Sequence, residues 1–149
     1  MANEIIMRWP ELKKQVRLAS IHHNQEVFEW FGSNLPTRCL QTCTVVAGLS
    51  LFMLNLPMEK EKCNWLQEEL PLENIVEMPI GRLTFFMTTG SVANLSCKFS
   101  DVTEAMSYVT WAEVVEEDKA TLQEVGATIW ENTLSEKMPI HVEFVRMEG

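Results

Sequence analysis

Apolar and polar residues alternate along several short segments of the chain, which is the pattern expected of β-strands with one buried face. Alternation is found in 15–21 and 140–146, and β-prone or apolar runs predict further strands at 4–9, 37–47, 49–54, 81–89, 92–99 and 108–115. Short connections predict two hairpins, one across Pro10 and one across Thr89, Gly90 and Ser91. The chain is therefore expected to be mainly β.

Two further segments follow the helical period instead. In residues 24–35 the apolar positions are Val27, Phe28, Phe31 and Leu35. Asn24 is the predicted N-cap of this helix and Pro36 ends it. A second helix is predicted to begin at Asp118, and its apolar stripe is Leu122, Val125, Gly126, Ile129 and Thr133. Residues 57–77 mix charge with proline and asparagine, which predicts a surface excursion with at most one helical turn near 65–70.

The order of these elements favours a closed β-barrel with two helices packed on it. One helix follows the first hairpin and the other precedes the last strand, whereas a doubly wound sheet would place a helix after nearly every strand. Closing the barrel also removes exposed strand edges. No repeat or linker interrupts the pattern, so a single domain is expected over residues 1–149.

The charge balance restricts the partners that the chain can have. It carries 12 Lys and Arg residues against 21 Asp and Glu residues, a formal net charge of -9. This sign disfavours a nucleic-acid partner, because a phosphate backbone is itself negative. An anionic small molecule would need local cations, and the candidates are Arg38, Arg82, Lys98 and Arg146.

The cysteines indicate neither a metal site nor a disulfide framework. Cys39, Cys43, Cys63 and Cys97 form no CxxC pair and no spaced set with histidine, so they are expected to be buried, reduced thiols. No window of 18 apolar residues and no basic leader occur, so we expect a cytoplasmic protein with no membrane partner.

Several short stretches carry a resemblance to a known family. They are Trp9-Pro10-Glu11-Leu12, residues 24–36 (NQEVFEWFGSNLP), residues 90–95 (GSVANL), residues 101–104 (DVTE), and the stretch from 117 through 130–132 (WEN) to the strand 140–143 (IHVE). Together with the element order, they resemble the cucumopine and mikimopine synthase group of cyclophilin-like proteins. The resemblance covers nearly the whole chain and implies a cyclophilin-like barrel.

The same resemblance implies opine-type chemistry without a cofactor. The amino group of histidine would join the keto carbon of 2-oxoglutarate, and the ring would close through the imidazole carbon in a Pictet–Spengler reaction. The implied partners are two small molecules, an amino acid and a 2-oxo acid. Such a reaction needs cations for the carboxylates, an acid to expel water and a base to take the ring proton.

Candidate residues for these roles lie mostly between positions 82 and 111. Lys98 and Arg82 are the predicted carboxylate partners, although solvated strand ends are the more common role for such cations. Glu104 and Tyr108 follow the Lys98 strand and are candidates for the base and the phenolic donor.

Histidines and aromatic residues supply further candidates. His141 on the last strand could transfer a proton, or it could face solvent or pack in the core. His22 and His23 are interpreted as a polar turn before the first helix. Phe86 and Trp111 could wall an apolar pocket for the substrate, or belong to the core.

Two other functions remain open at the level of sequence. A non-catalytic ligand-binding or interaction domain is one, because a fold does not fix a function. A prolyl isomerase is the less favoured one, because the arginine that true cyclophilins use lacks its aromatic and glutamine context here. A homo-oligomer is also considered, since Phe28, Trp30 and Phe31 nearly encircle the first predicted helix.

Overall fold

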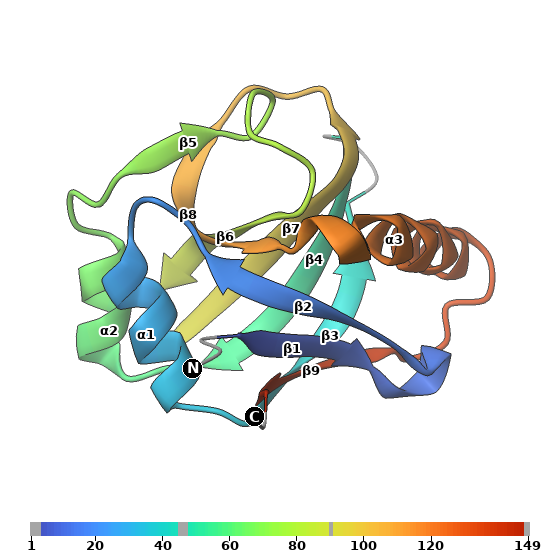
Figure 1. The fold of residues 1–149 in the computed structure, drawn as a ribbon, viewed down its shortest axis with the longest axis horizontal. Coiled ribbons are helices and arrows are strands. Elements are labelled where there is room, and N and C mark those ends of the chain that lie inside the picture. Colours follow the sequence, from blue (N-terminus) through green and yellow to red (C-terminus); the bar gives the residue numbers. More distant parts are fainter. Residues whose placement is uncertain (1–3, 45–47, 90, 148–149) are drawn as a thin grey trace.

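The computed structural model describes residues 4–44, 48–89 and 91–147 (Figure 1). Its strands are β1 (Ile5–Trp9), β2 (Lys14–Ser20), β3 (Thr37–Cys43), β4 (Gly48–Pro57), β5 (Leu72–Asn74), β6 (Arg82–Thr89), β7 (Val92–Val102), β8 (Ser107–Val114) and β9 (His141–Arg146). Its helices are α1 (Gln25–Ser33), α2 (Lys60–Leu66) and α3 (Lys119–Leu134), with short 3-10 turns at Pro10–Leu12 and Glu116–Asp118.

Eight of these strands form a closed antiparallel barrel. They follow the order β2-β1-β9-β3-β4-β7-β6-β8, and β8 pairs with β2 through Leu18 and Val114, which completes the ring. The short strand β5 pairs with another part of β8 and lies outside the ring. The predicted mainly β, cyclophilin-like closed barrel is therefore confirmed, as are both predicted hairpins.

The helices cover the ends of the barrel because each has one apolar face. Phe28 and Phe31 of α1 are buried, and the Phe31 ring lies 4.5 Å from that of Trp111 inside the barrel. Trp30, on another side of α1, packs on Trp65 of α2 with a centroid distance of 5.7 Å. The helix α3 lies at the opposite end (Figure 1). It buries most of its predicted stripe, and Gly126 lies against the ring of Phe99.

The segment between β4 and β6 holds more regular structure than its sequence predicts. A third helix, α2, forms here because Cys63 and Leu66 are buried on one face despite the surrounding charges. Strand β5 forms because β8 offers it a partner. Residues 45–47 of the predicted strand 37–47, and Gly90 of the second hairpin, lie outside the described residues. No helix among the described residues is long and apolar enough to cross a membrane.

The side chains of the two predicted N-cap residues bind distant segments instead of capping their helices. Asn24 precedes α1 with φ of 55°, and its side chain makes no cap hydrogen bond. Instead its amide donates to the carbonyls of Pro71 and Thr110, at 2.8 Å each. Asp118 precedes α3 and accepts hydrogen bonds from the backbone and guanidinium of Arg17. In both cases a partner from a distant segment replaces the local capping bond.

Candidate functional site

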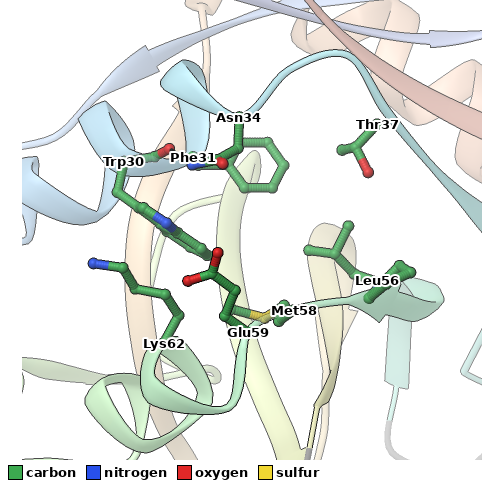
Figure 2. Close-up of a pocket in the computed structure, with 9 residues that line it drawn as sticks. Trp30, Phe31, Asn34, Thr37, Leu56, Met58, Glu59 and Lys62 are labelled. Carbon is green, nitrogen blue, oxygen red and sulfur yellow. Dashed lines mark hydrogen bonds between the residues drawn. The ribbon is translucent and has the colours of Figure 1, made fainter.

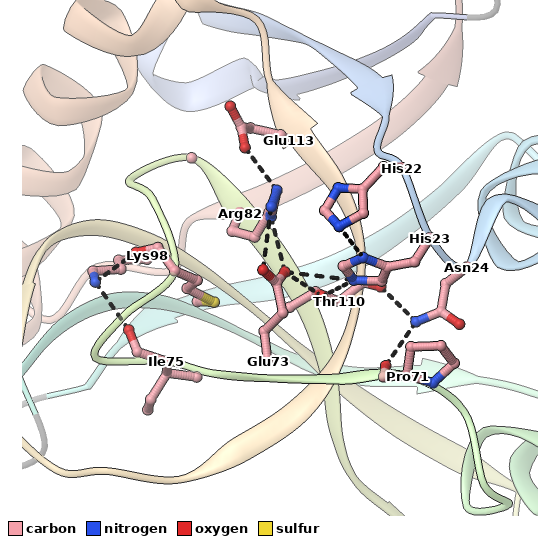
Figure 3. A network of polar contacts seen from close by, with 12 residues as sticks. His22, His23, Asn24, Pro71, Glu73, Ile75, Arg82, Lys98, Thr110 and Glu113 are labelled. Atoms are coloured by element: carbon pink, nitrogen blue, oxygen red, sulfur yellow. Dashed lines mark hydrogen bonds and ion pairs between the residues drawn. The ribbon is translucent and has the colours of Figure 1, made fainter.

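One cavity and one polar network are the candidate functional sites among the described residues. The first is a cavity of about 540 Å³ at the C-terminal end of α1 (Figure 2). It is lined by Trp30, Phe31, Asn34, Thr37, Leu56, Pro57, Met58, Glu59 and Lys62. The second is a polar network on the outer face of the barrel, beside the start of α1 (Figure 3). The second place gathers the acid–base groups and is described first.

Strand alternation creates the outer polar face. In β6, Leu83 and Phe85 belong to the core inside the barrel, so Arg82, Thr84 and Phe86 point outward. Their register partners on β7 and β8 are also polar, and Thr84 is paired with both Ser96 and Thr110. The outward polar residues Ser50, Arg82, Thr84, Ser96, Lys98 and Thr110 are nevertheless buried.

Residues 71–80 cover part of this face, and Lys98 holds them there. Its ammonium donates to the carbonyls of Ile75, Val76 and Met78 at 2.8 to 3.0 Å. Burial lowers the pKa of Lys98, against the opposing attraction of Asp101. Three hydrogen bonds use the three N–H donors of an ammonium group. Lys98 therefore fixes the covering segment to β7.

Arg82, itself buried, is the centre of a charge cluster on the same face. Its guanidinium donates to both carboxylate oxygens of Glu73 at 3.0 and 3.2 Å, and to Glu113 at 3.0 Å. Lys119 adds a second cation, 2.9 Å from Glu113. The bidentate contact fixes the orientation of Glu73, whose side chain stays 23% exposed and can be approached from outside.

The partners of Thr110 determine the tautomers of two histidines. Thr110 donates its only hydroxyl hydrogen to Glu73, so it must accept from Nε2–H of His23 at 2.7 Å. The neutral His23 ring then accepts at Nδ1 from Nε2–H of His22, at 2.9 Å. His22 is exposed. A continuous hydrogen-bonded chain thus runs from solvent through His22, His23 and Thr110 to Glu73 (Figure 3).

His23 is kept neutral by its surroundings. Burial lowers its pKa, and the nearby charges of His22 and Arg82 lower it further, against the attraction of Glu73. At neutral pH the His23 ring can therefore both donate and accept one hydrogen bond. This is the state that a proton relay requires.

Aromatic rings continue the outer face beyond this network. The Phe86 ring lies 4.7 Å from that of Phe52 and 5.2 Å from that of Tyr108. Successive outward residues of a strand lie roughly 6.5 Å apart, so Phe86 is one such step from Thr84. Burial raises the pKa of the Tyr108 phenol, and the charge of Glu104 adds to this.

The structure brings five of the eight candidate residues to this face or its rim. Arg82, Phe86, Lys98 and Tyr108 point outward from β6, β7 and β8, and Glu104 is exposed in the connection before β8.

The other three candidates lie elsewhere. Trp111 is fully buried inside the barrel, because it follows the outward-facing Thr110 and successive strand residues point to opposite faces. Arg38 and His141 lie on the β3–β9 pair, bound to Glu143 and Glu11 respectively.

Three residues of the network were not predicted to act together. His23 was interpreted as part of a turn, Glu73 fell in the supposed surface excursion, and Thr110 was not considered. The only local sequence pattern that could have indicated this network is the histidine pair before an asparagine. Glu73 and Thr110 are 37 residues apart, so no local pattern joins them. Among the described residues, no group of three or more His, Cys, Asp or Glu side chains could hold a metal ion.

Comparison with known proteins supports the fold. No family model and no curated protein matches the chain. Among solved structures, McbB in complex with tryptophan superimposes with a TM-score of 0.84 at 24% sequence identity. The match covers 97% of this chain but 45% of that one, so the chain spans less than half the length of McbB. The two proteins therefore share the barrel fold.

Proposed function

We propose that this chain is a cofactor-independent enzyme that condenses an amino acid with a 2-oxo acid on the outer face of the barrel. The observation that carries the proposal is the carboxylate of Glu73, held by Arg82 and linked through Thr110 and His23 to solvent. The resemblance to cucumopine and mikimopine synthases, and the tryptophan bound by McbB, support an amino acid as one substrate.

The proton balance of the reaction suits this chain of groups. Attack of the amine on the keto carbon gives a carbinolamine, and one proton is needed to expel its hydroxyl as water and form the iminium ion. Carbon–carbon bond formation from the aromatic ring then releases one proton from the ring carbon. One proton enters and one leaves, so a carboxylate that exchanges protons through a reversible relay serves both steps.

We assign the roles accordingly. Glu73 delivers the first proton and removes the second, and His22, His23 and Thr110 transfer protons between Glu73 and solvent. Phe86 and Tyr108 support the substrate ring. Arg82 and Lys98 are already hydrogen-bonded to protein oxygens, so we assign them to positioning Glu73 and residues 75–78 rather than to binding carboxylates.

The test is product formation from L-histidine, or L-tryptophan, with 2-oxoglutarate and other 2-oxo acids. Mass spectrometry would follow a product equal to the sum of the substrates minus one water. We expect E73Q to lower the rate by about 100-fold or more, the usual scale for a positioned acid–base group. The exposed Glu77 lies on the same segment, so E77Q is the matched control.

A second pair of variants decides between two carboxylates. Glu104 is the base expected from sequence, and E104Q should leave most of the rate if Glu73 has that role. Loss of product in E104Q but not in E73Q would overturn the assignment. Absence of product with every substrate pair, from protein that melts normally, would instead favour a ligand-binding domain.

A further inference from the structure

The cavity at the C-terminal end of α1 has no part in the proposed reaction. The reaction is assigned to groups before and beside the start of α1, whereas the cavity is lined by Trp30, Phe31 and Asn34 from its last turns. Its volume of about 540 Å³ lies within the usual range of small-molecule sites. It is therefore large enough for a small molecule that takes no part in that reaction.

The inner wall of the cavity is aromatic and apolar. Phe31 and Leu56 are buried side chains of the barrel end, and Met58 adds a polarisable thioether beside them. Trp30 forms the side toward α2, where Trp65 meets its ring edge to face. Such a wall favours a flat, apolar group, because aromatic rings add a geometric preference to the burial of apolar area.

Glu59 and Lys62, two residues of opposite charge, lie on the α2 side of this cavity, and the Lys62 ammonium points past Trp30, away from Leu56 (Figure 2). The Lys62 ammonium lies 5.9 Å from the Trp30 ring centroid and 4.9 Å from that of Trp65. Glu59, three residues earlier, lines the same cavity. Within the described residues, neither side chain forms an ion pair with the other or with a third residue.

We infer that this cavity binds a free α-amino acid with an aromatic side chain. The ligand carboxylate would pair with Lys62 and its ammonium with Glu59, which a zwitterion satisfies at once and a simple acid or amine does not. The ring would pack on Trp30 and Phe31. Asn34 and Thr37 place an amide and a hydroxyl on the opposite side of the cavity from Glu59 and Lys62 (Figure 2).

Titration with L-phenylalanine tests this site without any turnover. Calorimetry measures the affinity, and a change in tryptophan fluorescence that is lost in W30F reports contact with Trp30, since phenylalanine itself absorbs at shorter wavelength. We expect saturable binding that is weakened about tenfold or more in K62Q and in E59Q. The neighbouring exposed residues of α2 supply matched controls, K60Q and E61Q, which should bind as the wild type does.

Two truncated ligands separate the two contacts even if a variant is unstable. 3-Phenylpropionate lacks the ammonium, and phenethylamine lacks the carboxylate. Both should bind wild-type protein more weakly than phenylalanine does. K62Q has lost the partner of the ligand carboxylate, so its affinities for phenylalanine and phenethylamine should differ less than those of the wild type.

Three outcomes would overturn the inference. The first is that phenylalanine does not bind saturably to the wild-type protein. The second is that phenylalanine binds equally well to the wild type, K62Q and E59Q. The third is that E73Q loses phenylalanine binding while K62Q retains it. The last outcome would place the ligand on the outer face. Failure of the proposed reaction would leave phenylalanine binding and its Lys62 dependence intact, so the two proposals fail separately.

Discussion

The polar residues of the outer face act through their partners rather than one by one. Thr110 has a single hydroxyl hydrogen, and its donation to Glu73 settles which nitrogen of His23 carries a proton. Lys98 likewise uses its ammonium on three backbone carbonyls. Each side chain therefore has a role that its residue type alone does not specify.

The lowered pKa of His23 predicts a pH dependence of stability. The unfolded state binds a proton near the ordinary histidine value, whereas the folded state resists it until a lower pH. The free energy of unfolding should therefore fall as the pH drops below about 6.5 and level off once His23 is protonated in the folded state. In H23Q, the free energy of unfolding measured by urea titration should lack this dependence on pH between about pH 7 and 5. A wild-type curve parallel to that of H23Q would contradict the prediction.

Lys98→Met should loosen the segment that covers the outer face. The change leaves the carbonyls of Ile75, Val76 and Met78 without their donor, and we expect a loss of roughly 2–4 kcal/mol in the free energy of unfolding. Hydrogen exchange should quicken at the amide of Ile75. The exposed Lys60 provides the control, since K60M removes a similar side chain without these bonds. Unchanged exchange at Ile75 in K98M would show that other contacts hold the segment.

At the scale of elements, α3 depends on close contact with the barrel. Gly126 lies in its buried stripe, where a Cβ atom would overlap the Phe99 ring. The glycine is therefore needed for close approach, although alanine has the higher helix propensity. The helix can approach β7 only because this position has no side chain.

Gly126→Ala should destabilise the protein by about 1–3 kcal/mol through overpacking against Phe99. Gly32 in α1 is the matched helical position, where the nearest atom to a new Cβ is the end of the flexible Arg146 side chain at 3.3 Å. We expect G32A to stay within about 0.5 kcal/mol of wild type, because the gain in helix propensity offsets a small shift. Thermal or urea unfolding of both variants provides the comparison, and equal effects would contradict it.

Most elements could be predicted from sequence, and the exceptions share a cause. The alternating strands and the helices 24–35 and 118–133 were expected because each buries one regular face. Helix α2 and strand β5 were not expected, because they have only seven and three residues respectively, too few to show a period. Their partners, β6, β7 and β8, supply the stability that local sequence lacks.

At the scale of the whole molecule, barrel closure buries positions from every part of the chain. All four cysteines are buried free thiols, on β3, α2 and β7. Burial raises the pKa of Cys39 and Cys43 to about 12, and it also raises that of Cys63 and Cys97. The thiolate form needed for reaction is therefore scarce at neutral pH.

The folded protein should react slowly with a thiol reagent such as dithiobis-nitrobenzoate. Addition of guanidinium chloride should release all four thiols to the reagent at once, because unfolding is expected to be cooperative. The ratio of native to unfolded reaction rates measures this protection. Rapid reaction of one thiol in native buffer would show local opening, and mass mapping would identify the strand concerned.

The order and period of apolar residues determined the mainly β barrel and the faces of two helices, because burial of one face imposes a regular spacing. Only the tertiary structure decided which polar residues meet. His23, Glu73 and Thr110 are far apart along the chain, and barrel closure and the pairing of β5 with β8 bring them together. Hydrogen bonding depends on distance in space, and spacing along a sequence carries no record of it when the partners lie on different elements.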